Sequence, residues 1–159
     1  MTTPLDTKLA PNFTFGELTA TGNLRFVDVN RRAAEHFLKP LTELAEMAQV
    51  VRNKFGPVVI HSGFRCASLN THVGGSATSQ HCKGEAIDFH CTKASLTEVF
   101  DWIRKESKLE FGQLILEGAR PEAPTWIHLS LGHPWRPKAS SGQAMTYNKQ
   151  DNKYVVVHD

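Results

Sequence analysis

The segment Ser79–His90, which reads SQHCKGEAIDFH, constrains this chain more than any other stretch. Its second half alternates between apolar and polar residues as a short strand does, so Asp88 and His90 are predicted to share one face. His81 precedes this strand in a loop, and Gly84 gives the loop the freedom to fold back toward Asp88. The segment therefore predicts an imidazole and a carboxylate lying close together beside a strand.

A second predicted strand, Trp126–Leu131, offers another imidazole. Alternation places Trp126, His128 and Ser130 on one face of it. Catalytic zinc needs three protein ligands and an open position for water, and His81, Asp88 and His128 form a set of that kind. Taken alone, a His–Asp pair is also consistent with two hydrogen-bonded side chains that hold no metal. Cys82 adjoins His81 as a competing ligand, but in an extended segment its side chain points away.

Three motifs carry a family resemblance: SGFRCASLN at 62–70, SQHCKGEAIDF at 79–89 and WIHLS at 126–130. Together they resemble the zinc D-alanyl-D-alanine peptidase family, peptidoglycan peptidases whose fold is shared with the hedgehog signalling domain. The resemblance covers roughly residues 12–131, and its core has matching residues at five fixed positions: Ser79, His81, Gly84, Ala86 and Asp88. It implies Zn²⁺ held by His81, Asp88 and His128, and a peptidoglycan stem peptide as substrate.

Hydrolysis also needs a base, and two glutamates precede His128. Glu117 ends the predicted strand 113–117, which we expect to pair antiparallel with 126–131, whereas Glu122 lies in a proline-rich loop. Some relatives carry their acidic residue three positions before the last zinc histidine, where this chain has Thr125. Others have a strand-end glutamate, which Glu117 matches. We therefore favour Glu117 as the base and keep Glu122 as the alternative.

Three further residues are predicted to contact substrate. Arg65 follows a strand, and its planar guanidinium suits a peptide carboxylate or a polarised carbonyl; the resemblance places the family's arginine there. Ser79 matches a position that contacts substrate in relatives. Trp126 stands where relatives often carry histidine, and since tryptophan cannot shuttle a proton, we expect it to line the cleft. His90 is a candidate to support Asp88.

The predicted order is helix, strand, strand, helix, strand, strand, which does not alternate as βαβ units do. It indicates an α+β fold with helices packed on a small, largely antiparallel sheet, and the resemblance implies the same. We expect one domain over residues 1–159. It has a loosely held N-terminal arm at about 1–11 and a C-terminal hairpin tail at about 140–159.

The formal charge of +2 and the absence of a Lys/Arg run argue against nucleic-acid binding. No secretory signal or membrane span is apparent, so we expect a monomer made in the cytoplasm that reaches the wall after lysis or as a virion component. This setting suits a bacteriophage endolysin or a prophage copy. The three cysteines are odd in number and lack zinc-ribbon spacing, which predicts reduced thiols.

The sequence thus predicts a zinc-dependent peptidoglycan hydrolase. Two alternatives stay open. The enzyme is either a D-Ala-D-Ala carboxypeptidase or an endopeptidase that cuts at L-Ala-D-Glu or a cross-link. A different class, a non-catalytic zinc-stabilised module that binds the cell wall, also fits a zinc site.

Overall fold

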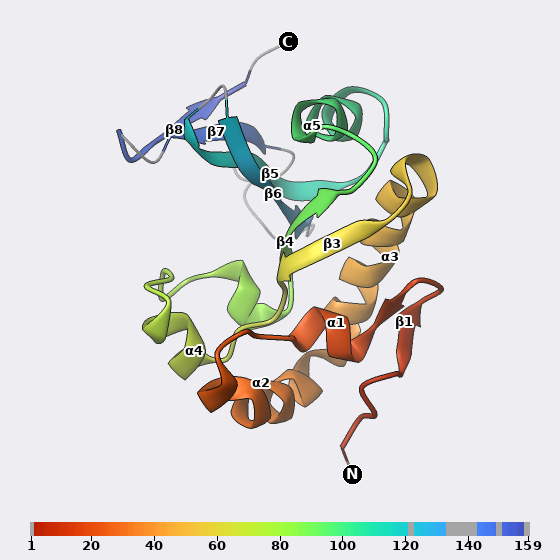
Figure 1. Ribbon diagram of the computed structural model, residues 1–159, viewed down its shortest axis with the longest axis vertical. Coiled ribbons are helices and arrows are strands. Elements are labelled where there is room, and N and C mark those ends of the chain that lie inside the picture. Colours follow the sequence, from red (N-terminus) through yellow and green to blue (C-terminus); the bar gives the residue numbers. More distant parts are fainter. Residues whose placement is uncertain (1, 121–122, 133–142, 149–150, 158–159) are drawn as a thin grey trace. The chain divides into compact units, whose positions relative to one another are not determined.

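The computed structural model describes residues 2–120, 123–132, 143–148 and 151–157 (Figure 1). The chain forms two compact units. The first comprises Met1–Val50 and Ile60–Ile87, and the second comprises Val51–Val59 and Asp88–Asp159. The single-domain organisation expected over 1–159 stays a prediction. Among the described residues, no helix combines the length and the apolar composition needed to cross a membrane.

The first unit is mainly helical. Its elements are β1 (Lys8–Ala10), β2 (Phe13–Thr14), α1 (Phe15–Thr19), α2 (Val27–Ala34), the greater part of α3 (Leu38–Phe55), α4 (Ala67–His72) and three 3₁₀ turns, η1 (Leu24–Phe26), η2 (Glu35–Phe37) and η3 (Gln80–Lys83). Helix α1 begins with a capping box, in which Thr14 and Glu17 each bond the other's backbone N–H. Helix α3 carries an apolar stripe at three- and four-residue intervals, and its buried members in this unit include Leu41, Leu44, Ala45 and Ala48.

Helix α3 begins before Pro40 rather than after it, since it starts at Leu38. A proline within a helical stretch predicts a break, but α3 has none near Pro40. Proline lacks a backbone N–H, but the first turn of a helix has no intrahelical partner for that group. Pro40 therefore lies where a helix tolerates it.

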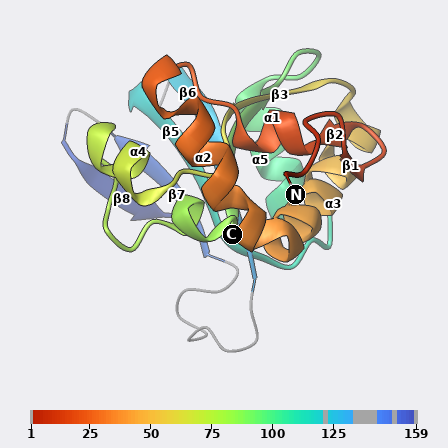
Figure 2. The same ribbon diagram turned by 90° about the horizontal axis from the view of Figure 1, so that it is seen from below.

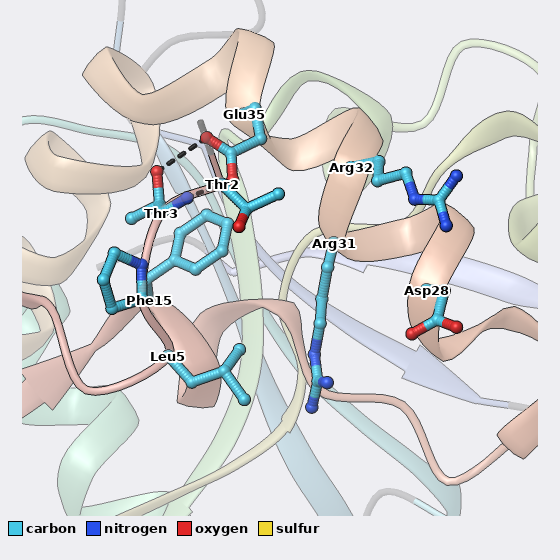
Figure 3. A pocket seen from close by; sticks show the side chains of 9 residues that line it. Thr2, Thr3, Leu5, Phe15, Asp28, Arg31, Arg32 and Glu35 are labelled. Atoms are coloured by element: carbon cyan, nitrogen blue, oxygen red, sulfur yellow. Dashed lines mark hydrogen bonds between the residues drawn. The ribbon is translucent and has the colours of Figure 1, made fainter.

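The N-terminal segment, predicted to be a loosely held arm, makes several contacts within the first unit. Strands β1 and β2 pair antiparallel (Figure 2). Asn12, in the turn between them, exchanges two hydrogen bonds of 2.9 Å with Gln49 of α3. Thr3 donates from its backbone N and its Oγ1 to the Glu35 carboxylate, at 2.6 Å each, beside a cavity of about 290 Å³ (Figure 3).

One six-stranded sheet has the strand order β3-β4-β6-β5-β7-β8. The strands are β3 (Val58–Ser62), β4 (Ala86–Cys91), β5 (Phe111–Arg120), β6 (Ala123–Leu131), β7 (Gln143–Asn148) and β8 (Lys153–Val156). As predicted, β5 and β6 pair antiparallel. Strand β7 runs parallel to β5 and antiparallel to β8, so the sheet is mixed. The α+β class is confirmed. Of the predicted tail, residues 140–142, 149–150 and 158–159 lie outside the described residues.

Helix α5 (Leu96–Lys105) packs on β5 and β6 in the second unit. Ser95 caps it by accepting a hydrogen bond from the Glu98 N–H. Apolar side chains from the helix and from one face of the two strands are buried: Val99, Phe100, Ile103, Leu114, Leu116, Ile127 and Leu129. This burial leaves the opposite face of β5 and β6 to carry the polar residues.

Candidate metal centre and active site

The η3 turn positions His81. Ser79 caps the turn, because its Oγ accepts a hydrogen bond of 3.3 Å from the His81 N–H. Gly84 ends the turn with φ +66°, a left-handed conformation that glycine adopts without strain. A side chain at Gly84 would also crowd Leu41 and Phe37. The loop that the sequence predicts to fold back at this glycine does so.

His81 is buried, with 3% of the residue exposed, and its Nδ1 donates to the Gly63 carbonyl at 2.8 Å. A carbonyl only accepts, so this bond selects the tautomer in which Nε2 carries the lone pair. Orienting a metal-binding histidine through its other nitrogen is common in metal sites. Gly63 itself has no room for a side chain, since a Cβ there would overlap the carbonyl oxygen of Leu18.

Asp88 of β4 and His128 of β6 lie on neighbouring strands. The Asp88 Oδ1 and His128 Nδ1 atoms are 2.9 Å apart, and the side chains are 12% and 11% exposed, respectively. Alternation along β6 points His128 away from the buried Ile127 and Leu129. Taken alone, the two side chains form a hydrogen-bonded pair.

His81 completes a metal-binding group with this pair. One ligand atom from each of His81, Asp88 and His128 lies within 4.8 Å of the other two. Two imidazoles and a carboxylate are the donors that catalytic zinc takes while a fourth position stays open for water. The donor set and the tautomer selected at His81 both fit a zinc ion.

The sequence of the chain matches the family model described as Peptidase M15 over residues 11–130. The chain belongs to the peptidase M15 family. Peptidases of this family are zinc-dependent, which agrees with the His81, Asp88 and His128 group. Comparison with curated proteins finds no match. The α+β fold of this M15 protein is likewise consistent with the family.

Glu117 lies on the same face of the sheet as His128. In the β5–β6 ladder Ile115 is opposite His128 and Glu117 is opposite Trp126, and directly paired residues share a face. Glu117 and His128 are therefore diagonal neighbours, at a spacing of about 7–8 Å in such ladders. The register shifts directly after Glu117, and irregularities of this kind often re-aim side chains beside active sites. Glu122 lies outside the described residues.

Arg65 makes two contacts with the His81 segment and a third with Ser62 of β3. Its backbone N–H donates to the His81 carbonyl at 3.1 Å. Its guanidinium donates to Ser79 Oγ at 3.2 Å and to Ser62 Oγ at 3.5 Å. Ser79, predicted to contact substrate, thus also caps η3 and holds the guanidinium in place.

Asn30 of α2 is a positioning residue that sequence reasoning missed. This buried side chain donates from Nδ2 to the carbonyls of Thr19 and Phe64, at 2.9 and 3.0 Å, and accepts from the Cys66 N–H at 2.7 Å. It therefore holds the backbone on both sides of Arg65. The available signal was its spacing, because Asn30 lies one helical turn before the buried Ala34 on the same face of α2.

Replacing Asn30 with alanine is expected to lower the free energy of unfolding by about 3 kcal/mol, since it leaves buried backbone groups without partners. Chemical denaturation measures the change. The matched control is Asn23→Ala, which removes a partly exposed cap of a short 3₁₀ turn and is expected to cost about 1 kcal/mol or less. Equal losses in the two variants would contradict the role given to Asn30.

The cysteines do not join the metal-binding group. All three are free. Burial raises the pKa of the Cys82 thiol, and burial raises the pKa of Cys91 to about 11. Neither thiol belongs to the group that His81, Asp88 and His128 form, so the Cys82 alternative loses support. His90 is partly buried on β4, where alternation puts it on the face of Asp88.

Proposed function

We propose that this M15 protein is a zinc-dependent peptidase that hydrolyses a peptide bond in the stem or cross-link peptides of bacterial peptidoglycan. The observation that carries the proposal is the His81, Asp88 and His128 group together with Glu117 on the face of His128. The proposal keeps the phage-type setting described above, a monomer that acts on the wall after release. The family match supports it at the level of the peptidase.

Different residues of the chain carry out the separate steps of the reaction. Zinc, when bound, supplies Lewis acidity, which makes water acidic enough to lose a proton near neutral pH. Glu117 accepts that proton and returns it to the nitrogen of the leaving amine. Arg65 donates to the carbonyl oxygen as it gains negative charge, or to a substrate carboxylate. Trp126, directly opposite Glu117, lines the face on which the peptide lies.

Digestion of purified peptidoglycan by the zinc-loaded protein, followed by mass spectrometry of the fragments, tests this function. We expect soluble fragments whose masses name the cleaved bond. The Glu117→Gln protein is the matched control and should release almost none. Binding to the wall without release of fragments would refute the peptidase and favour the wall-binding module.

Arg65 is expected to act mainly on turnover. Arg65→Ala should lower kcat on a soluble wall peptide by about 10²-fold or more with zinc retained, because its partner oxygen becomes charged only during attack. Arg65→Lys should restore little, since lysine lacks the planar two-pronged geometry. Steady-state kinetics with metal analysis measures both.

The control for these variants is Arg25→Ala, which changes an exposed arginine stacked 5.0 Å from the Phe26 ring. It should leave kcat unchanged. Wild-type turnover in Arg65→Ala would remove Arg65 from the catalytic residues.

A further inference from the structure

A cavity of about 290 Å³ lies within the first unit, between the N-terminal segment and helix α2 (Figure 3). Its lining combines apolar, hydroxyl and charged side chains and includes Thr2, Thr3, Pro4, Leu5, Phe15, Asp28, Arg31, Arg32 and Glu35. The match to the family model begins at residue 11, so the wall formed by residues 2–5 lies outside that match.

Backbone hydrogen bonds hold this N-terminal wall in place. The Gly16 N–H donates to the Leu5 carbonyl at 2.8 Å, and the Phe15 N–H donates to the Thr7 carbonyl at 2.9 Å. A Cβ at Gly16 would lie 2.8 Å from the Leu5 carbonyl oxygen, so this close approach requires glycine. Leu5 is therefore positioned by the first residues of α1.

Glu35 is bound by the same N-terminal segment. Thr3 donates to its carboxylate from the backbone N and from Oγ1, at 2.6 Å each. These two hydrogen bonds lower the pKa of the Glu35 carboxyl, so it is ionised near neutral pH. Glu35 lies four residues after Arg31, a spacing at which opposite charges on a helix attract each other. Arg31 nevertheless extends away from Glu35, toward Leu5 (Figure 3).

Arg31 is left with an unused donor. Its Nε is buried and has no hydrogen-bond partner among the residues that the structure describes. The other arginine of the lining, Arg32, is exposed and has Asp28 four residues before it on α2. A buried donor on a charged group is destabilising while it stays unbonded, and an acceptor that enters the cavity would remove this penalty. Arg31 is therefore the group to which an anion would bind.

The rest of the lining indicates which kind of anion fits. The planar guanidinium of Arg31 presents donors that match the oxygens of a carboxylate. Leu5 and Phe15 offer apolar contact for a short side chain, and the threonine hydroxyls can donate to or accept from an amide. Small-molecule sites span about 300–1,000 Å³, and this cavity lies at the lower end of that range. Its volume therefore suits a ligand of the size of an amino acid or a dipeptide.

We propose that this cavity binds a small organic carboxylate with a short apolar side chain, of the size of an N-acylated amino acid, and that Arg31 holds its carboxylate. The site uses none of the residues assigned to catalysis, and the inference does not rest on the proposed function. Such a carboxylate ends a wall peptide whose last residue has the D configuration, and it also ends a peptide of L residues. The two enantiomers of one probe distinguish these sources.

The test is a heteronuclear NMR titration of the zinc-loaded full chain with N-acetyl-D-alanine, N-acetyl-L-alanine and the carboxamide of each. The backbone amides of Leu5 and Gly16 report on the cavity. We expect their signals to shift with at least one of the two acids. That acid should bind about 10-fold more tightly than its carboxamide, because the amide lacks the charge that pairs with Arg31. The enantiomer that binds more tightly identifies the source, and equal binding of both acids supports a carboxylate site that accepts either.

Two variants locate the binding. Arg31→Gln should weaken binding of the acid about 10-fold and leave binding of the carboxamide unchanged. Leu5→Glu changes an exposed side chain and should also weaken it, because it supplies a competing carboxylate to Arg31 and repels the acid. This second variant decides the matter if Arg31→Gln does not fold. Arg25→Ala, an exposed arginine of the same unit, is the matched control and should bind as the wild type does. Arg65→Ala should also keep the shifts at the cavity, which separates this site from the proposed catalytic one.

Three results would overturn the inference: no shift at Leu5 or Gly16 with either acid, equal affinity for the acid and its carboxamide, or wild-type affinity in a folded Arg31→Gln protein. Each of them would leave the peptidase standing. Tight binding of the acid at the cavity by a protein that digests no peptidoglycan would support this site and refute only the proposed function.

Discussion

His128→Ala is expected to lose its zinc, falling from about one ion per chain to a small fraction of that, and to lose peptidase activity with it. Two protein ligands remain after the change, and catalytic zinc sites rely on three. His81→Ala and Asp88→Ala should have the same effect, because each removes one member of the same group. Metal analysis after dialysis measures the loss.

The control is His72→Ala. This exposed histidine lies against the Phe26 ring at 5.1 Å and is not part of the metal-binding group, so the variant should keep its zinc. Full zinc retention in His128→Ala would show that β6 supplies no ligand. Since zinc stabilises the state that binds it, wild-type protein should also unfold at a higher temperature with zinc than with chelator.

Glu117→Gln is expected to lower kcat by about 10²-fold or more while fold and zinc content stay unchanged. Glutamine has nearly the same shape, but an amide cannot accept and return the proton. Steady-state kinetics on a soluble wall peptide, with metal analysis of the same sample, measures this.

Glu122→Gln is the comparison variant and should leave kcat nearly unchanged. If the two results are exchanged, Glu122 is the base, and the placement of Glu117 beside His128 has no catalytic meaning. Glu98→Gln, an exposed change on α5, controls for any general effect of losing a carboxylate.

Local patterns predicted the parts of the site that depend on neighbours in the chain. Alternation predicted the face of His128 and the pairing of β5 with β6, which the register confirms. The conformational freedom of Gly84 predicted the turn that carries His81. The roles of Glu117, Arg65, Ser79 and Trp126 stay predictions.

The sequence by itself thus determined the family, the candidate ligands and the strands that carry Asp88 and His128, because these follow from fixed spacing and side-chain period. Only the tertiary structure decided that β7 lies parallel to β5 and that Asn30 brackets Arg65. The physical reason is the separation of the contacting residues along the chain. Periodicity describes residues a few positions apart, whereas these contacts join residues thirty or more positions apart through sheet pairing and buried hydrogen bonds, which leave no periodic signal.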